Sequence, residues 1–101
     1  MERPFASFDW DDANREKCQK HGVSVDEIEA LFRGTPRVAP DRKHSEGEKR
    51  FLAVGRNSIG RAMFVVFTLR NKDSQTFVRP ISARYMHRKE IEGYEKESPS
   101  V

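Results

Sequence analysis

The 101-residue sequence has few of the features that mark secreted or membrane-spanning proteins. It contains a single cysteine, Cys18, so no disulfide can form within the chain, which fits a reducing compartment. No stretch approaches the roughly 20 consecutive apolar residues that a membrane-spanning helix needs. The N-terminal segment also lacks the apolar core of a signal peptide. We therefore expect a cytoplasmic protein without a membrane partner.

Apolar residues are scarce, at 36% of the chain, whereas charged residues reach 35%. The apolar residues are nevertheless clustered, which argues for a folded domain rather than disorder. A chain of this length can bury roughly 60–65% of the surface that its unfolded form exposes. We expect a single domain over residues 1–101, with a core at 8–94 and a frayed tail at 95–101.

The net charge of +3 conceals a segregation of charge along the chain. Residues 1–32 carry 4 basic and 8 acidic side chains, residues 33–89 carry 14 and 4, and residues 90–101 carry 1 and 4. A concentrated positive field in the middle of the chain favours an anionic partner such as nucleic acid. A basic, solvated surface without a partner would give the same counts.

Capping signals predict two helices near the N-terminus. Asp11 is a favourable N-cap for a helix that ends near His21, and Gly22 follows where a left-handed residue is favoured. Ser24 and Glu27 form a capping box that starts a second helix. Apolar side chains at helical spacing give the second helix a buried face: Val25, Ile28, Leu31 and Phe32.

The second half of the chain predicts four strands and a closing helix. The strands are expected at 37–40, 49–55, 61–70 and 75–82, with a polar loop at 41–48. The third strand is apolar on both faces, which indicates a central strand covered on both sides. Pro80 cannot donate to a ladder, so it marks an edge position or the end of the last strand.

Ser82 can then cap a helix over residues 83–97. The predicted fold class is α+β, with two N-terminal helices, a four-stranded antiparallel meander and a C-terminal helix.

Four cationic side chains crowd the predicted junction between the last strand and the last helix: Arg79, Arg84, Arg88 and Lys89. A helix start usually favours acids, because its free N–H groups already carry partial positive charge. The same N–H groups and a guanidinium together make a favourable phosphate site. Arg84 therefore binds a phosphate or pairs with an acid such as Asp9 or Asp12. In a meander Arg61 can converge with Arg84, whereas Arg70 reaches the same place only across the sheet.

His21 is a candidate for proton transfer. A helix C-terminus stabilises the imidazolium, although simple charge complementarity would place a histidine there as well. Cys18 and His21 are three residues apart on the predicted helix, a spacing at which both could bind one metal ion. The other two histidines, His44 and His87, are not spaced as metal ligands usually are, so no cofactor or metal is expected. Tyr85 either stacks on a base or belongs to the core or its rim.

The order of several short motifs resembles the BrnT toxin family over residues 8–94. The matching motifs are Trp10-Asp11, Lys20-His21-Gly22-Val23, Glu48, Gly60-Arg61, Thr68-x-Arg70 and Ile81-Ser82-Ala83-Arg84. Each motif is short, and it is their ordered set that is specific.

The resemblance implies a RelE-like fold and a ribonuclease toxin of a type II toxin–antitoxin pair that inhibits translation and growth. It implies as partners an RNA substrate, a BrnA-like ribbon-helix-helix antitoxin, and operator DNA bound through the antitoxin complex. Catalytic roles are carried over to the polar members of the motifs: Lys20, His21, Arg61, Arg70 and Arg84. Further RNA contacts are expected from Thr68, Arg79, Tyr85 and Arg88.

A ribonuclease that works without metal needs a base for the 2′-hydroxyl, cations for the phosphate and an acid for the leaving 5′ oxygen. We expect the three arginines to bind the phosphate and His21 or Lys20 to transfer protons, which leaves a 2′,3′-cyclic phosphate. Two other function classes remain open. One is an inactive binding module that acts only as antitoxin partner and co-repressor. The other is an unrelated basic DNA-binding domain, which the negative charge of the first two helices disfavours.

Overall fold

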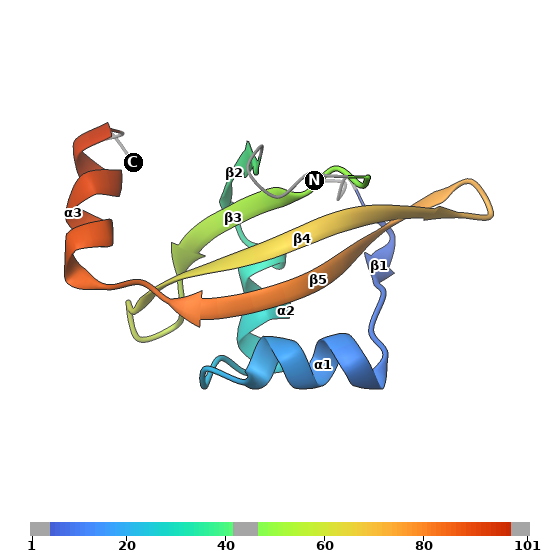
Figure 1. Ribbon diagram of the computed structural model, residues 1–101, viewed down its shortest axis with the longest axis horizontal. Coiled ribbons are helices and arrows are strands. Elements are labelled where there is room, and N and C mark those ends of the chain that lie inside the picture. Colours follow the sequence, from blue (N-terminus) through green and yellow to red (C-terminus); the bar gives the residue numbers. More distant parts are fainter. Residues whose placement is uncertain (1–4, 42–46, 98–101) are drawn as a thin grey trace.

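The computed structural model describes residues 5–41 and 47–97, which form three helices and five strands (Figure 1). In chain order these are β1 (Ser7–Phe8), α1 (Asp12–Gln19), α2 (Val25–Arg33), β2 (Arg37–Pro40), β3 (Phe51–Arg56), β4 (Ala62–Lys72), β5 (Gln75–Tyr85) and α3 (Arg88–Glu97). Helices α1 and α2 pack on the sheet, and α3 stands beyond the end of β5 (Figure 1). The predicted α+β class is confirmed. No helix of the described residues is long and apolar enough to cross a membrane.

The sheet has the strand order β1-β5-β4-β3-β2. Strands β2 to β5 form the predicted antiparallel meander, with β4 in the centre. The prediction of only four strands is wrong, because β1 adds a fifth strand parallel to β5, with Ser7 opposite Phe77 and Phe8 opposite Val78. A strand of two residues has no alternating pattern to read. The sheet is therefore mixed rather than purely antiparallel.

Both N-terminal helices begin at their predicted capping signals. The carboxylate of Asp11 accepts a hydrogen bond of 2.9 Å from the N–H of Asn14, whose side chain accepts one of 2.7 Å in return. Ser24 and Glu27 form the predicted capping box at the start of α2. Each box satisfies two N–H groups that would otherwise lack a partner.

The core lies between the sheet and the two N-terminal helices. Phe32 of α2 packs edge-on against Phe67 of β4, with ring centroids 4.9 Å apart. The buried apolar cluster comprises Cys18, Val23, Ile28, Leu31, Phe32, Ala53, Met63, Val65, Phe67, Val78 and Ala83. On the opposite face of β4, Phe64 and Val66 are only half-buried. The predicted burial of this strand on both faces is therefore only partial.

The largest correction concerns the segment after Pro80. Strand β5 continues to Tyr85 and α3 begins at Arg88, so the predicted helix start at Ser82 is wrong. The reason is the length of β4, whose 11 residues offer ladder partners as far as the end of β5. Arg84 thus lies in a strand, opposite Phe64, and not in the first turn of a helix.

Pro80 lies within β5 and not at its end. On one side it faces Phe67 of β4, and the ladder skips Ile81, which forms a bulge next to it. On the other side, the pairing with β1 stops at Val78. There the carbonyl of Pro80 accepts a 2.8 Å hydrogen bond from the side chain of Asn14 in α1. The edge alternative is therefore confirmed for this part of β5.

Two predictions fall partly outside the described residues. Residues 42–46 of the predicted loop at 41–48, which include His44, are not described. Residues 95–97 of the predicted tail belong to α3, which ends at Glu97 as predicted for the last helix, and residues 98–101 lie outside the described range.

Candidate active site at the end of strand β5

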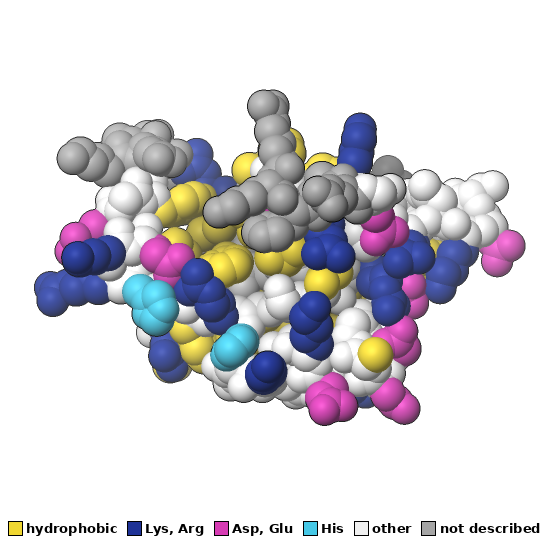
Figure 2. Space-filling view, viewed as in Figure 1, with side chains coloured by type: hydrophobic (Ala, Val, Ile, Leu, Met, Phe, Trp, Pro, Cys, Tyr) yellow, Lys and Arg dark blue, Asp and Glu magenta, His cyan; other side chains and the backbone are white. Residues whose placement is uncertain are grey.

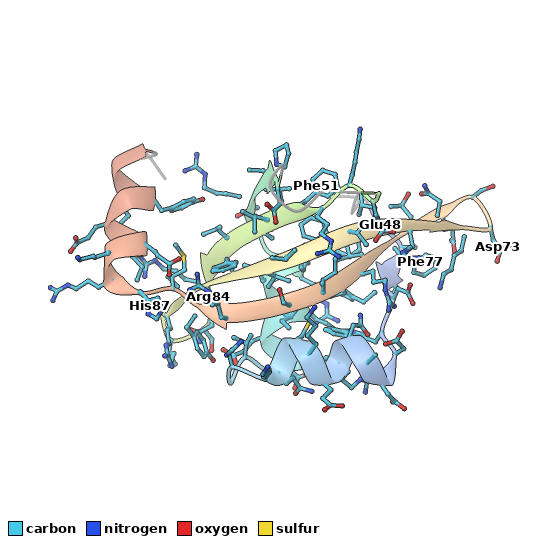
Figure 3. All side chains as sticks on the ribbon, viewed as in Figure 1. Glu48, Phe51, Asp73, Phe77, Arg84 and His87 are labelled. Carbon is cyan, nitrogen blue, oxygen red and sulfur yellow. The ribbon has the colours of Figure 1, made fainter. Side chains whose placement is uncertain are left out.

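Two histidines and two arginines line one surface pocket where β5 ends and α3 begins. The pocket has a volume of about 350 Å³ and is lined by His21, Arg61, Arg84, Tyr85, Met86 and His87. A hydrogen bond of 2.9 Å from the N–H of Met86 to the carbonyl of Ala62 joins the first residue of β4 to the segment that leads into α3. Figure 3 shows Arg84 and His87 close together at this end of the sheet. In Figure 2 both described histidines lie on one face, beside Lys and Arg side chains.

The turn after α1 brings His21 to the pocket. Helix α1 ends at Gln19 rather than at the predicted His21, and the N–H of Gly22 donates to the Gln19 carbonyl at 3.1 Å. Gly22 has a φ of +93°, the left-handed conformation predicted for it, which glycine adopts at little cost. His21 is therefore exposed in a turn, whereas Cys18 is buried in the core.

Because Cys18 is buried in the core and His21 is exposed in a turn, the basis for a metal site formed by these two residues is removed. Among the residues that the structure describes, no group of three or more His, Cys, Asp or Glu side chains could hold a metal ion.

Tyr85 ties the pocket to the N-terminus of α2. Its hydroxyl lies 2.9 and 2.8 Å from the two carboxylate oxygens of Glu27, to which it donates. The same carboxylate accepts from the side chain of Asn57 at 2.8 Å and from the N–H of Ser24 at 3.0 Å. Glu27 thus joins three segments beneath the pocket: α2, the β3–β4 turn and the end of β5.

These hydrogen bonds fix the protonation of the pair. The bond to Glu27 is the main cause that raises the pKa of the Tyr85 phenol, which therefore stays protonated at neutral pH. Desolvation raises the pKa of the Glu27 carboxyl, but the bonds from Asn57, Ser24 and Tyr85 outweigh it, and the net pKa is lowered. Tyr85 is therefore a neutral donor that holds the pocket floor.

Arg61 stacks on this floor. Its guanidinium carbon lies 3.7 Å from the centroid of the Tyr85 ring, a cation–π contact. The backbone N–H of Arg61 donates to the side-chain oxygen of Asn57 at 2.8 Å. Among the described residues, Arg61 forms no ion pair with a carboxylate. Its guanidinium is exposed and available to an incoming anion.

Arg84 is held differently. It lies 4.2 Å above the ring of Phe64 and donates two hydrogen bonds, both of 2.7 Å, to the carboxylate of Glu90 in α3. The predicted alternative of a pair with Asp9 or Asp12 is therefore wrong. Hydrogen bonds from Arg84, and then from the N–H of His87, lower the pKa of Glu90 to about 2. Glu90 occupies the guanidinium edge that a phosphate would use.

Several predicted site residues lie away from this pocket. Arg70 sits toward the far end of β4 and pairs with Glu48 at 3.3 Å; Figure 3 shows Glu48 well separated from Arg84. Thr68 is buried, and its hydroxyl donates to the carbonyl of Lys49 at 2.8 Å. The structure therefore does not bring Arg70 and Thr68 together with Arg84.

The remaining cations are also placed elsewhere. Arg79 forms a 2.7 Å ion pair with Asp11, at the start of α1. Lys20 follows α1 directly and lines a separate shallow hollow with Lys17. Arg88 is 93% exposed and lies 3.6 Å from Glu92 of the same helix. Among the predicted residues, the structure thus gathers only His21, Arg61, Arg84 and Tyr85.

Sequence reasoning missed two residues that shape the site, His87 and Glu90. The predicted helix start at Ser82 places both in the interior of a helix. The N–H of His87 donates to the carboxylate of Glu90 at 2.9 Å, so an acid lies three residues after the residue that precedes the helix. An acid at the third position after the residue before the helix is the half of a capping box that could have located the start.

The comparison with protein families agrees with the motifs. The family model described as "Ribonuclease toxin, BrnT, of type II toxin-antitoxin system" matches residues 10–90, from Trp10, next to the N-cap of α1, to Glu90. No curated protein matches the chain. Membership of a type II toxin family implies an antitoxin partner. The chain belongs to the BrnT family of ribonuclease toxins.

Proposed function

We propose that the protein is an endoribonuclease that cleaves mRNA in the pocket between His21 and His87, without a metal ion. The attacking group is the 2′-hydroxyl of the RNA, and the products are a 2′,3′-cyclic phosphate and a 5′-hydroxyl. The observation that supports this best is that two imidazoles and two guanidiniums line a single open pocket.

The arginines supply the electrostatic part of the reaction. As the 2′ oxygen attacks, negative charge develops on the phosphorane oxygens, and cations fixed nearby stabilise it. Arg61 is oriented by its contact with the ring of Tyr85, and Arg84 by its contact with the ring of Phe64. Two guanidiniums held by aromatic rings lose little freedom when phosphate binds. Arg70 and Lys20, which lie outside the pocket, are assigned at most to the flanking parts of the RNA.

The histidines supply proton transfer. Histidine changes charge close to neutral pH, so one imidazole can accept the 2′ proton while another donates to the 5′ oxygen. His21 and His87 come from different segments, the turn after α1 and the residue before α3. We assign proton transfer to this pair, with His21 as the residue indicated by both the motif and the geometry.

The proposal is tested with purified protein, a short RNA and EDTA in the buffer. His21→Ala should lower the cleavage rate by about 10²–10⁴-fold, the usual contribution of a positioned acid or base. Arg61→Ala should lower it by about 10²-fold, as the loss of one charge-stabilising group does. Arg15→Ala is the matched control, because Arg15 is an exposed arginine on α1 outside the pocket. Equal cleavage rates for all three variants would show that the reaction does not take place in this pocket.

The toxin would be controlled by a BrnA-like antitoxin, and the complex would bind its operator and repress it. The basic central part of the chain favours an acidic antitoxin surface, since complementary charge speeds capture and excludes RNA. Release of the toxin would then allow cleavage of mRNA, arrest of translation and arrest of growth.

One observation favours the second candidate, an inactive module that only binds antitoxin and assists repression. Both terminal nitrogens of the Arg84 guanidinium already donate to Glu90. Protein that stays inert on RNA, does not arrest growth, and yet joins antitoxin on operator DNA would establish this alternative.

A further inference from the structure

Three arginines project from the face of the sheet that α1 and α2 leave open. Arg37 of β2 lies opposite Val54, and Arg84 of β5 lies opposite Phe64. Directly opposed residues share a face, and so do alternate residues along a strand. Since Ala53 and Met63 point into the core, Arg37, Arg56 and Arg84 point away from it.

Helix α3 places an acid on two of these arginines. Glu90 accepts both hydrogen bonds of Arg84, and the carboxylate of Glu95 lies 3.4 Å from the guanidinium of Arg56. Five residues of helix separate the two acids by about 7.5 Å along the helix axis. Two negative groups thus lie in a row on a basic face, as the phosphates of a nucleic-acid strand do.

Helix α3 is poorly packed against the sheet. A cavity of about 290 Å³ separates it from the sheet, with Val54 and Ile91 among its walls, and Figure 2 shows apolar side chains beside α3 there. The Arg37 guanidinium lies 5.4 Å from the ring centroid of Tyr94. Yet one nitrogen of Arg37 and the hydroxyl of Tyr94 are buried without a hydrogen-bond partner among the described residues. Such groups weaken the docking of the helix, and its ion pairs through Glu90 and Glu95 are contacts that phosphates can replace.

We propose that α3 covers a binding surface for single-stranded RNA formed by Arg37, Arg56 and Arg84. In the covered state Glu90 and Glu95 take the places of phosphates, and the Tyr94 ring takes the place of a stacked base. RNA binds after α3 moves aside. The inference rests on the proposed function, because Arg84 belongs to both the surface and the catalytic pocket. RNA is favoured over an acidic protein segment because Met86 lines both cavities, which makes the surface continuous with that pocket.

The test measures binding apart from cleavage. The probe is a short, fluorescent single-stranded RNA with every 2′-hydroxyl methylated, which the proposed reaction cannot cleave. The double variant Glu90→Gln with Glu95→Gln should bind it at least about fivefold more tightly than wild type, because two competing charges are lost. The matched control is Glu16→Gln with Glu92→Gln, which makes the same change in net charge at exposed acids away from the three arginines. Its affinity should change by less than about twofold.

A third variant tests whether the gain in RNA affinity depends on Arg56. Adding Arg56→Gln to the first double variant should return the affinity close to that of wild type. Equal gains for both double variants, or no gain for either, would overturn the proposal. A gain for a poly-glutamate peptide but not for RNA would overturn it too, since the surface would then take an acidic protein segment.

The binding result is independent of catalysis. If the first double variant binds the methylated RNA more tightly and wild type does not cleave ordinary RNA, the RNA-binding surface is supported and the proposed ribonuclease activity is rejected. Cleavage of ordinary RNA without the gain in binding would do the reverse.

Discussion

The hydroxyl of Tyr85 offers a test of how the pocket is held together. Tyr85→Phe removes the hydrogen bond to Glu27 and keeps the ring beneath Arg61. A hydrogen bond to a charged group contributes about 1.5–3 kcal/mol when one partner is removed. Here Asn57 and Ser24 still hold the carboxylate, at 2.8 and 3.0 Å. The expected loss in unfolding free energy is therefore about 1–2 kcal/mol.

This loss is measurable in two ways. It should lower the thermal midpoint by roughly 4–16 °C, given about 4–8 °C per kcal/mol for a domain of this size. Urea denaturation should show a lower midpoint with an unchanged slope. The rate of RNA cleavage should stay within about threefold of wild type, because the ring that orients Arg61 remains.

Tyr94→Phe is the matched control. It deletes the same hydroxyl from a tyrosine whose oxygen has no hydrogen-bond partner among the described residues, so stability should not fall and can rise slightly. Equal destabilisation by both variants would refute the account of Glu27. A large loss of cleavage in Tyr85→Phe with full stability would place the hydroxyl in the chemistry instead.

Three further predictions concern other parts of the chain. Glu90→Gln should destabilise the protein mainly near neutral pH: hydrogen bonds from Arg84 lower the carboxyl pKa from 4.5 to about 2, so the contribution is full above pH 4.5 and fades as the pH falls toward 2. Unfolding free energies of wild type and variant should therefore converge on acidification, and a constant difference would contradict this. Burial raises the pKa of the Cys18 thiol to about 11, so a thiol reagent at pH 8 should modify the native protein at least about 100-fold more slowly than the urea-unfolded one. Arg79→Ala should lower the urea midpoint, because it breaks the ion pair with Asp11, and should leave the cleavage rate within about threefold of wild type. A variant that keeps full stability but loses cleavage would show that Arg79 contacts RNA, as the sequence predicts.

Local signals in the sequence located the starts of the two N-terminal helices. Asp11, Ser24 and Glu27 have side chains that satisfy helix N–H groups within three residues, so their effect does not depend on the rest of the chain. The left-handed backbone of Gly22 is local in the same sense. The position of β4 in the centre also followed from its own apolar pattern.

The C-terminal half depended on long-range pairing. Ser82 and the residues after it suit a helix when read alone, yet the length of β4 draws them into β5. Because the end of β5 was misplaced, the partner of Arg84 was misplaced as well: Glu90 reaches it only when α3 starts at Arg88. The convergence of Arg61 with Arg84 was anticipated, since a meander brings the start of one strand to the end of the next.

The most direct test of the proposed reaction is the chemistry of the cut RNA ends, read by mass spectrometry. Wild-type protein should leave a 2′,3′-cyclic phosphate and a 5′-hydroxyl, and a 2′-deoxy nucleotide at the cleaved position should block the cut. His21→Ala and Arg61→Ala, folded as judged by urea denaturation, should yield the same ends far more slowly. A 3′-hydroxyl with a 5′-phosphate, or undiminished cleavage by both variants, would contradict the assignment of this pocket.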